Sequence, residues 1–212
     1  MAQRKIGIIG YGVIGQQIEH FVLEQHPGNE VEFFYFDDIL HAKGKAYPFT
    51  DFCNNKFKDL EFYVGLGYHH MGLRNDVYEQ LKKSQFCSPN IIHKTSYIHP
   101  TAEIANGVVI YPMCNIGEFV KIKDGVLVNN SSVISHDSYI DRGTFISPGV
   151  IISGRVSVGQ CCFIGTGTVI ANEIKIGNNV QTGIGTVVTA NIEDNLSVIG
   201  NPMKISKSLK IK

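Results

Sequence analysis

A histidine followed by an aspartate, His136-Asp137, stands in a stretch of the chain that is almost free of other ionisable side chains. Between residues 125 and 172 the other acidic, basic or imidazole side chains are Asp141, Arg142 and Arg155. A carboxylate beside an imidazole orients the ring and stabilises its cation, which general-base catalysis requires. The alternative interpretation is that His136 is an ordinary solvent-exposed histidine at a turn, with no role in catalysis. The pair is our candidate for acid–base chemistry, with His136 as the base and Asp137 as its support.

A glycine-rich turn, GYGVIG, is the second candidate, and it holds Gly10, Gly12 and Gly15. It follows an apolar run and precedes a helical pattern, so its amides and the helix N-terminus can hold phosphate. Asp37-Asp38 ends the next expected strand, where an acidic residue meets a ribose or a base. An NAD site is the literal interpretation, but no catalytic domain for hydride transfer follows. A site for a mononucleotide moiety and a purely structural turn are the alternatives.

Residues 1–92 are expected to form an α/β domain that positions this turn. Apolar runs predict strands, and apolar residues at helical spacing predict helices. The expected order is strand 5–9, a helix from 14 to about 27, strands 31–36 and 61–66, and a helix around 74–83. That order is half of a doubly wound nucleotide-binding fold, a half-Rossmann domain. Residues 88–96 would form the hinge to a second domain, 93–212.

A six-residue repeat organises the second half and must position His136. From Ile98 to Ile176 every sixth residue is Ile or Val; the series slips at Thr182 and resumes at Val188. Neither an α-helix nor a flat sheet has this period, whereas a prism-shaped parallel β-solenoid does. Three hexapeptides close one coil, so residues 98–192 give about five coils with the aliphatic residues stacked inside. Residues 204–212 hold four lysines and are expected to lie over the last coil.

Composition excludes several classes of protein. Charged residues are 18% of the 212, Lys+Arg and Asp+Glu are 19 each, and the net charge is zero, which argues against a nucleic-acid-binding protein. No apolar run is long enough to cross a bilayer, and no signal peptide is evident, so a cytoplasmic protein is expected. The five cysteines include the adjacent pair Cys161-Cys162, whose side chains would point to opposite faces of a strand. Metal binding is disfavoured because His99 and His136 are far apart along the solenoid.

The chain resembles, over nearly its full length, the left-handed β-helix (hexapeptide-repeat) acyltransferases. The similar branch comprises sialic acid O-acetyltransferases and bacillosamine-type nucleotide-sugar N-acetyltransferases. The segments that carry the resemblance are GYG, FDD, VGLG, IIHKTSYIHPTA, VLVNNSSVISHDSYID, ISPGVIISGRVSVG, FIGTGTVI and IGNPMK. The resemblance implies an α/β half-Rossmann domain followed by a left-handed parallel β-helix. It also implies a homotrimer with active sites between subunits.

The family's functional residues match particular positions of this chain. His136 matches the catalytic base and Asp137 the acidic residue that supports it. Acetyl-CoA, the acyl donor, would be bound by Asn129, Phe145, Gly154, Thr166 and Ile184. Phe145 stands where some relatives have a histidine near the thioester. The nucleotide-linked sugar would be bound by Gly10, Tyr11, Gly12, Asp37, Asp38, Gly67 and Tyr68.

The expected function is therefore N-acetylation, by acetyl-CoA, of the amino group (at C4) of a nucleotide-linked amino-dideoxy sugar in bacterial surface-glycan biosynthesis. His136 would take the proton, and the N–H of Gly154 would stabilise the tetrahedral oxyanion. No metal takes part in this scheme. O-acetylation of a sugar hydroxyl, as on sialic acid, is the nearest alternative. A non-catalytic nucleotide-sugar-binding scaffold and a nicotinamide oxidoreductase are the others.

Overall fold

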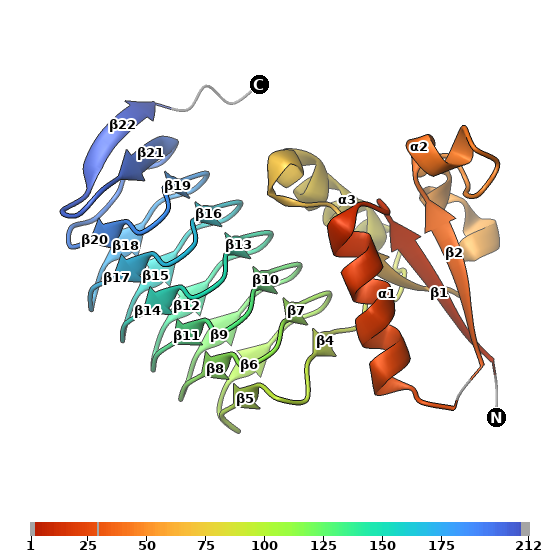
Figure 1. Cartoon of the computed structure of the whole chain (residues 1–212), viewed down its shortest axis with the longest axis horizontal. Coiled ribbons are helices and arrows are strands. Elements are labelled where there is room, and N and C mark those ends of the chain that lie inside the picture. The colour runs from red at the N-terminus through yellow and green to blue at the C-terminus, as the bar shows by residue number, and fades with distance from the viewer. Residues whose placement is uncertain (1–2, 29, 209–212) are drawn as a thin grey trace. The chain divides into compact units, whose positions relative to one another are not determined.

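The computed structural model describes residues 3–28 and 30–208 (Figure 1). The chain forms two compact units, Met1–Ile91 and Ile92–Lys212. The first is an α/β unit, and the second is a β-solenoid.

The first unit is built on a three-stranded parallel sheet with the strand order β2-β1-β3. Its strands are β1 (Arg4–Ile9), β2 (Val31–Phe36) and β3 (Glu61–Val64), and its helices are α1 (Val13–Gln25), α2 (Asp38–His41) and α3 (Met71–Lys83). Short 3-10 segments lie at Phe49–Cys53, Asn55–Phe57 and Tyr68–His70. The expected strands and helices are present in the expected order, and the short helix α2 between β2 and β3 was not expected. The third strand ends two residues earlier than expected, and the last helix begins at Met71 because a 3-10 turn leads into it.

Aromatic residues make much of this unit's core. Phe36, at the end of β2, and Phe62, on β3, are fully buried, and their ring centroids lie 5.8 Å apart. Phe57, from the segment between β2 and β3, meets Phe36 edge-to-face at 4.9 Å. Burial of each such side chain stabilises the fold by about 1.5–3 kcal/mol. The loop between β2 and β3 is therefore anchored to the sheet by its aromatic side chains.

The second unit winds around three parallel sheets, as the six-residue repeat predicts (Figure 1). The first sheet contains β4 (Ile91–Ile92), β7 (Val109–Ile110), β10 (Leu127–Val128), β13 (Phe145–Ile146), β16 (Phe163–Ile164), β19 (Gln181–Thr182) and β21 (Leu196–Ile199). The second contains β5 (Tyr97–Ile98), β8 (Asn115–Ile116), β11 (Val133–Ile134), β14 (Ile151–Ile152), β17 (Val169–Ile170) and β20 (Val187–Val188). The third contains β6 (Glu103–Ile104), β9 (Lys121–Ile122), β12 (Tyr139–Ile140), β15 (Ser157–Val158) and β18 (Lys175–Ile176).

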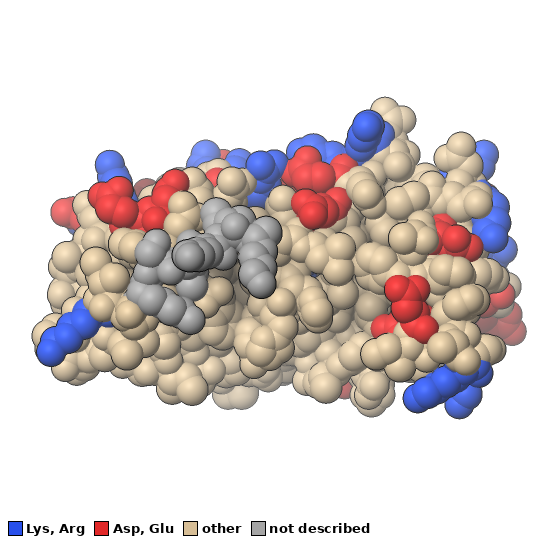
Figure 2. Space-filling model, turned by 90° about the horizontal axis from the view of Figure 1, so that it is seen from above, with Lys and Arg blue, Asp and Glu red and all other residues tan. Residues whose placement is uncertain are grey.

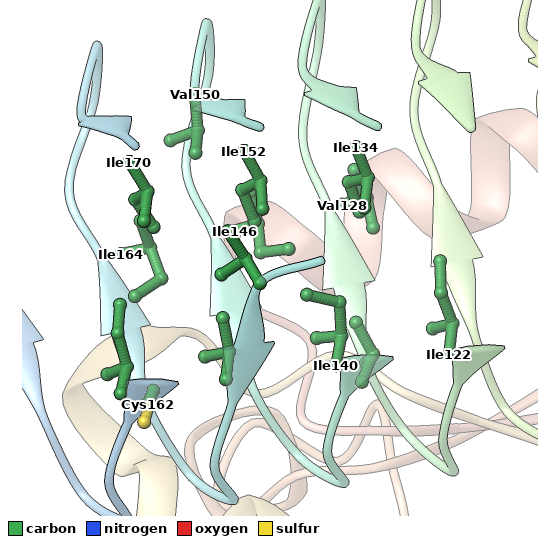
Figure 3. Close-up of a cluster of buried hydrophobic side chains, with 14 of the residues drawn as sticks. Ile122, Val128, Ile134, Ile140, Ile146, Val150, Ile152, Cys162, Ile164 and Ile170 are labelled. Atoms are coloured by element: carbon green, nitrogen blue, oxygen red, sulfur yellow. The ribbon is translucent and has the colours of Figure 1, made fainter. Parts of the chain in front are cut away.

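The aliphatic residue of each hexapeptide points into the prism and stacks on its equivalents in the adjacent coils (Figure 3). Partners in register are eighteen residues apart, as Ile134 and Ile152 are on the second sheet. Ile134, Ile140, Ile146 and Ile152 are completely buried. A charged side chain inside this stack would lose its hydration without gaining a partner. The stack therefore explains the low content of charged residues.

Thr182 keeps the inward position although it interrupts the aliphatic series. It lies in register with Ile164 and is 2% exposed. Its hydroxyl is within 2.9 Å of the Thr168 hydroxyl and accepts the N–H of Gly165 at 2.8 Å. A buried hydroxyl is tolerated when it is hydrogen-bonded. At Thr182 the inward residue is therefore polar instead of aliphatic, and the register of the coil is unchanged.

A last strand folds back on the preceding one. Strand β22 (Lys204–Ser208) pairs with β21 in antiparallel fashion, with Ile205 opposite Val198. The expectation that the lysine-rich tail lies over the last coil concerns residues 204–212. Residues 209–212 lie outside the described part of the chain.

Charged side chains are scattered over the surface. On the face drawn in Figure 2, acidic and basic groups are interspersed among larger areas of uncharged residues. Within residues 3–28 and 30–208, no helix combines the length and the apolar character needed to span a membrane.

Candidate active site

His136 and Asp137 are the two central residues of a turn that follows strand β11. We call the line of turns that follow the second-sheet strands the second edge of the prism. Asp137 has a φ of 57°, in the left-handed region, which aspartate tolerates better than most residues. Its N–H donates to the carbonyl of Glu118 in the previous coil at 2.9 Å. The pair is thus fixed by the solenoid itself and remains open to a ligand, with the side chains 47% and 51% exposed.

The two side chains form the dyad that the sequence predicts. His136 Nδ1 lies 2.8 Å from Asp137 Oδ2. Because a carboxylate only accepts hydrogen bonds, we assign the hydrogen to Nδ1. Nε2 then keeps its lone pair and can accept a proton. The geometry suits a general base held in one tautomer by a carboxylate.

Gly154 lies directly against the face of the imidazole, one coil further along. A methyl group at this position would be 2.5 Å from His136 Nε2 and 2.7 Å from Cε1. Any larger residue would therefore push the ring out of its place. The N–H of Gly154, expected to be an oxyanion donor, donates here to Oδ1 of Asn172 at 3.0 Å. The sequence analysis gave Asn172 no role.

A column of charged residues runs beside the dyad along the same edge. Arg155 and Glu173 occupy the position of Asp137 in the next two coils. Arg155 Nε and the Glu173 carboxylate are 2.9 Å apart, and a second guanidinium nitrogen is 2.7 Å from the same oxygen. The guanidinium of Arg155 thus forms an ion pair with Glu173 in the next coil, and the carboxylate of Asp137 is hydrogen-bonded to His136.

The residues expected to bind acetyl-CoA do not all lie on the second edge. Asn129, Thr166 and Ile184 lie in turns that follow first-sheet strands, which we call the first edge. Ile184 is 84% exposed, an unusual state for isoleucine. Phe145 lies on the outer face of the first sheet and is 3% exposed, and its ring is tilted against that of Phe163 with the centroids 5.9 Å apart. Of this set, Gly154 lies directly against His136.

In the first unit, the three glycines of GYGVIG have different structural roles. Gly10 has a φ of 80°, which makes the sharp turn after β1. Gly15 packs on that turn, since a methyl group there would be 2.4 Å from the carbonyl oxygen of Gly10. Gly12 has no neighbouring atom within 4 Å of such a methyl group. This division of roles is the one that a phosphate-binding turn requires, with the second glycine left open for a ligand.

Gly65 and Gly12 offer a test that separates packing from binding. A methyl group at Gly65 would lie 2.2 Å from the Gly10 carbonyl oxygen and 2.6 Å from the Gly15 Cα, both backbone atoms. Gly65→Ala is therefore expected to destabilise the unit by about 1–3 kcal/mol, since backbone cannot move aside cheaply. Gly12→Ala, the matched control, should leave Tm within a degree or two. Thermal unfolding of both variants measures this, and equal values of Tm would contradict the packing role of Gly65.

The acidic pair after β2 holds the turn together. Asp37 accepts the N–H of Tyr11 with Oδ2 and the N–H of Leu40 with Oδ1, each at 2.9 Å. Asp38 Oδ1 accepts the N–H of Phe49 at 2.8 Å. The Asp37 carboxylate thus links the glycine turn to the N-terminus of α2. Sequence reasoning gave both residues a ligand-binding role and did not foresee these bonds.

Tyr11 is anchored in the same way. Its hydroxyl donates to Glu19 of α1, and its ring meets Tyr35 edge-to-face at 4.4 Å. Burial, together with the hydrogen bond to Glu19, raises the pKa of the Tyr11 phenol above its ordinary value. The phenol therefore stays neutral, and its ring forms one wall of the turn.

The segment after β3 faces the same end of the sheet. Gly67 is followed by Tyr68 and His69, whose rings are 4.0 Å apart, and Tyr68 is 45% exposed. Arg74 of α3 is fully buried, and its Nη1 donates to the carbonyl of Leu66 at 2.9 Å. This contact of Arg74 was not expected from the sequence. Arg74 shares a helix face with the apolar residues Val77 and Leu81, and this spacing could have indicated that its side chain is buried.

The cysteines are free thiols in the described residues, and burial raises the pKa of Cys162 to about 12. Such a thiol is a poor nucleophile at neutral pH. Across the described ranges, no three His, Cys, Asp or Glu side chains come together as a metal site.

Comparison with known proteins extends these observations. The family described as GMPPB C-terminal domain matches residues 91–195. The acetyltransferase domain of PglB from Neisseria gonorrhoeae is 27% identical, with a TM-score of 0.84 over 95% of this chain and 99% of that one. The same domain in complex with acetyl coenzyme A gives a TM-score of 0.85 over 96% and 100%. PerB from Caulobacter crescentus, in complex with CoA and GDP-perosamine, shares the fold at 23% identity, with a TM-score of 0.85 over 96% and 97%.

The similarity to the PglB domain extends over both units of the chain, whereas the family model matches the solenoid. The six-residue period, the three parallel sheets and the matched acetyltransferase domain agree with one another. The chain has the fold of the left-handed β-helix (hexapeptide-repeat) acyltransferases.

Proposed function

We propose that the protein transfers the acetyl group of acetyl-CoA to the amino group, at C4, of a nucleotide-linked amino-dideoxy sugar. The observation that carries the proposal is the His136–Asp137 dyad at 2.8 Å with an open Nε2. The similar PglB domain has been solved with acetyl coenzyme A, and PerB with CoA and GDP-perosamine. A glycine turn with an open second glycine, in the first unit, suits the nucleotide part of the acceptor.

The chemistry follows from the groups present. The amine nitrogen of the sugar attacks the thioester carbon, and the carbonyl π pair moves onto oxygen. His136 Nε2 accepts the proton that the nitrogen loses, and Asp137 stabilises the resulting imidazolium through Nδ1. When the tetrahedral intermediate collapses, the C=O bond re-forms, the C–S bond breaks and coenzyme A leaves as the thiolate. His136 then returns its proton to the thiolate or to solvent.

We also propose that the enzyme is a homotrimer with its active sites between subunits. The dyad lies on the second edge, whereas Asn129, Thr166 and Ile184 lie on the first edge, so one chain does not bring them together. The second sheet lies between these two edges. Packing through this sheet in a closed three-fold ring would bring the first edge of one copy beside the second edge of the next.

The outer face of the second sheet suits such an interface. Its outward residues form a ladder at eighteen-residue spacing that is mostly apolar: Tyr97, Asn115, Val133, Ile151, Val169 and Val187. Tyr97 is 55% and Ile151 44% exposed. The third sheet instead presents charged residues, including the pair Glu103 and Lys121 at 3.1 Å. Contiguous apolar surface of this kind marks interaction sites.

A thiol-release assay with acetyl-CoA tests the function. The acceptors are UDP-, dTDP- and GDP-linked 4-amino sugars, each paired with its 4-hydroxy counterpart. We expect CoA release with at least one amino sugar, and an N-acetyl product by mass spectrometry. Release with the hydroxy sugars alone would establish O-acetylation instead. Binding of nucleotide sugar without any CoA release would identify a non-catalytic scaffold.

A further inference from the structure

The turns of the solenoid are held together by side-chain caps that recur from coil to coil. An Asn or Asp at the first central position of a turn accepts the N–H of the residue eighteen positions earlier. Asn178 caps Gln160 in this way at 3.1 Å, and Asp124 caps Asn106 at 3.1 Å. Asn172 caps Gly154 at 3.0 Å. The cap by itself is therefore structural, and it occurs on more than one edge.

Asn172 differs from Asn178 in the hydrogen bonding of its amide nitrogen, Nδ2. Nδ2 of Asn178 donates to Asp194 at 3.3 Å, so both ends of that amide are bonded within the chain. Asn172 is exposed, and across residues 3–28 and 30–208 its Nδ2 group has no hydrogen-bond partner. Because Oδ1 is held by the Gly154 N–H, the NH₂ group is fixed in direction and is available to a ligand.

The position of this NH₂ group matters because of what Gly154 touches. The position of a methyl group at Gly154 is 2.5 Å from His136 Nε2, so the glycine lies between the proton acceptor and the Asn172 amide. A backbone N–H carries one hydrogen, and that of Gly154 is already donated. A transfer site on this edge needs a donor near His136 for the developing oxyanion. The Nδ2–H group of Asn172 is a hydrogen-bond donor held beside Gly154 by the Oδ1 bond.

We infer that Asn172 is a catalytic residue of the proposed acetyl transfer, with Nδ2–H as the hydrogen-bond donor to the thioester oxygen. As the amine nitrogen forms its bond to the carbonyl carbon, the π pair moves to that oxygen and the Nδ2–H bond to it strengthens. When the C–S bond breaks, the pair returns to the carbonyl. The inference rests on the proposed function and adds to it a residue that the expected mechanism lacks.

Asn172→Ala and Asn178→Ala form a matched pair that tests it. Each removes one cap of the same geometry, and Asn178→Ala also removes the bond to Asp194, so its decrease in Tm should be at least as large. Only Asn172→Ala should decrease kcat, by about a hundredfold, the usual effect of losing one oxyanion donor. Its KM for acetyl-CoA should change less than threefold. Asn172→Asp keeps an acceptor for Gly154 but replaces the donor with an anion, so its kcat should be lower still.

Three outcomes would overturn the inference. A kcat of Asn172→Ala equal to or above that of wild type would mean that the released Gly154 N–H serves as the donor. Equal decreases of kcat in both alanine variants would reduce Asn172 to a structural cap. A wild-type enzyme that releases no CoA with any acceptor, although it binds acetyl-CoA, would contradict the proposed function and with it the inference.

Discussion

Replacing His136 with alanine should decrease turnover by about 10²–10⁴-fold while the protein stays folded. The range is the usual contribution of a positioned acid–base group. The side chain is 47% exposed and its main partner is the neighbouring Asp137, so little packing is lost. The measurement is kcat from CoA release, with Tm recorded for the same preparations. Asp137→Asn should give a smaller decrease, because Nδ1 loses its carboxylate but the ring keeps Nε2.

His99→Ala is the matched control for this prediction. His99 lies at the start of a turn on the same edge, 3.7 Å from Glu118, and has no part in the proposed chemistry. Its removal should leave kcat within about twofold. If His136→Ala retained wild-type turnover, His136 would not be the base. If His99→Ala were equally inactive, the loss would reflect a general disturbance of the solenoid.

Replacing Ile151 with glutamate should produce monomers that have lost nearly all activity. Ile151 lies in the middle of the outward ladder of the second sheet and is 44% exposed in the single chain. A carboxylate at the centre of a subunit interface would lose its hydration without a partner, at a cost of several kcal/mol. The inward stack of the solenoid is untouched by this change. Analytical ultracentrifugation gives the mass, and the thiol-release assay gives the activity.

Ser157→Glu places the same charge on the third sheet and serves as the comparison. Ser157 faces outward between Tyr139 and Lys175 in register, on the face that already holds charged residues. This variant should keep both the mass and the turnover of the wild type. An Ile151→Glu protein that remained trimeric and active would contradict the assigned interface. A wild-type protein that sedimented as an active monomer would contradict the trimer itself.

The repeat made much of the solenoid predictable from the sequence, because an inward residue every sixth position leaves little choice of register. The same arithmetic explains why His136, Gly154 and Asn172 fall in one column, since they are eighteen residues apart. The glycine turn and the strand order of the first unit were predictable for a similar reason. In both cases the signal is a local pattern that only one kind of backbone can satisfy.

Other parts of the site were not predictable. Nothing in the residue types indicates that Asp37 bonds to the Tyr11 N–H or that Asn172 occupies the Gly154 N–H. Both depend on which way a short side chain turns once two distant segments have met. Thr182 shows the same point in the core, where a polar residue occupies an aliphatic position because hydroxyl partners meet it there. Hydrogen bonds between segments are decided by the fold, so a single sequence conveys them poorly.

The eighteen-residue coil has a consequence for how such an enzyme can change length. Each coil contacts mainly its two neighbours, so the solenoid behaves as a one-dimensional stack. An insertion of eighteen residues adds one coil, and every following side chain stays on the same edge of the prism. An insertion of six moves all later turns by one edge, which would separate Asn172 from Gly154 if it fell between them. Insertions within the solenoid that preserve the site must therefore add whole coils, whereas insertions in the corner loops can be of any length because they extend away from the prism.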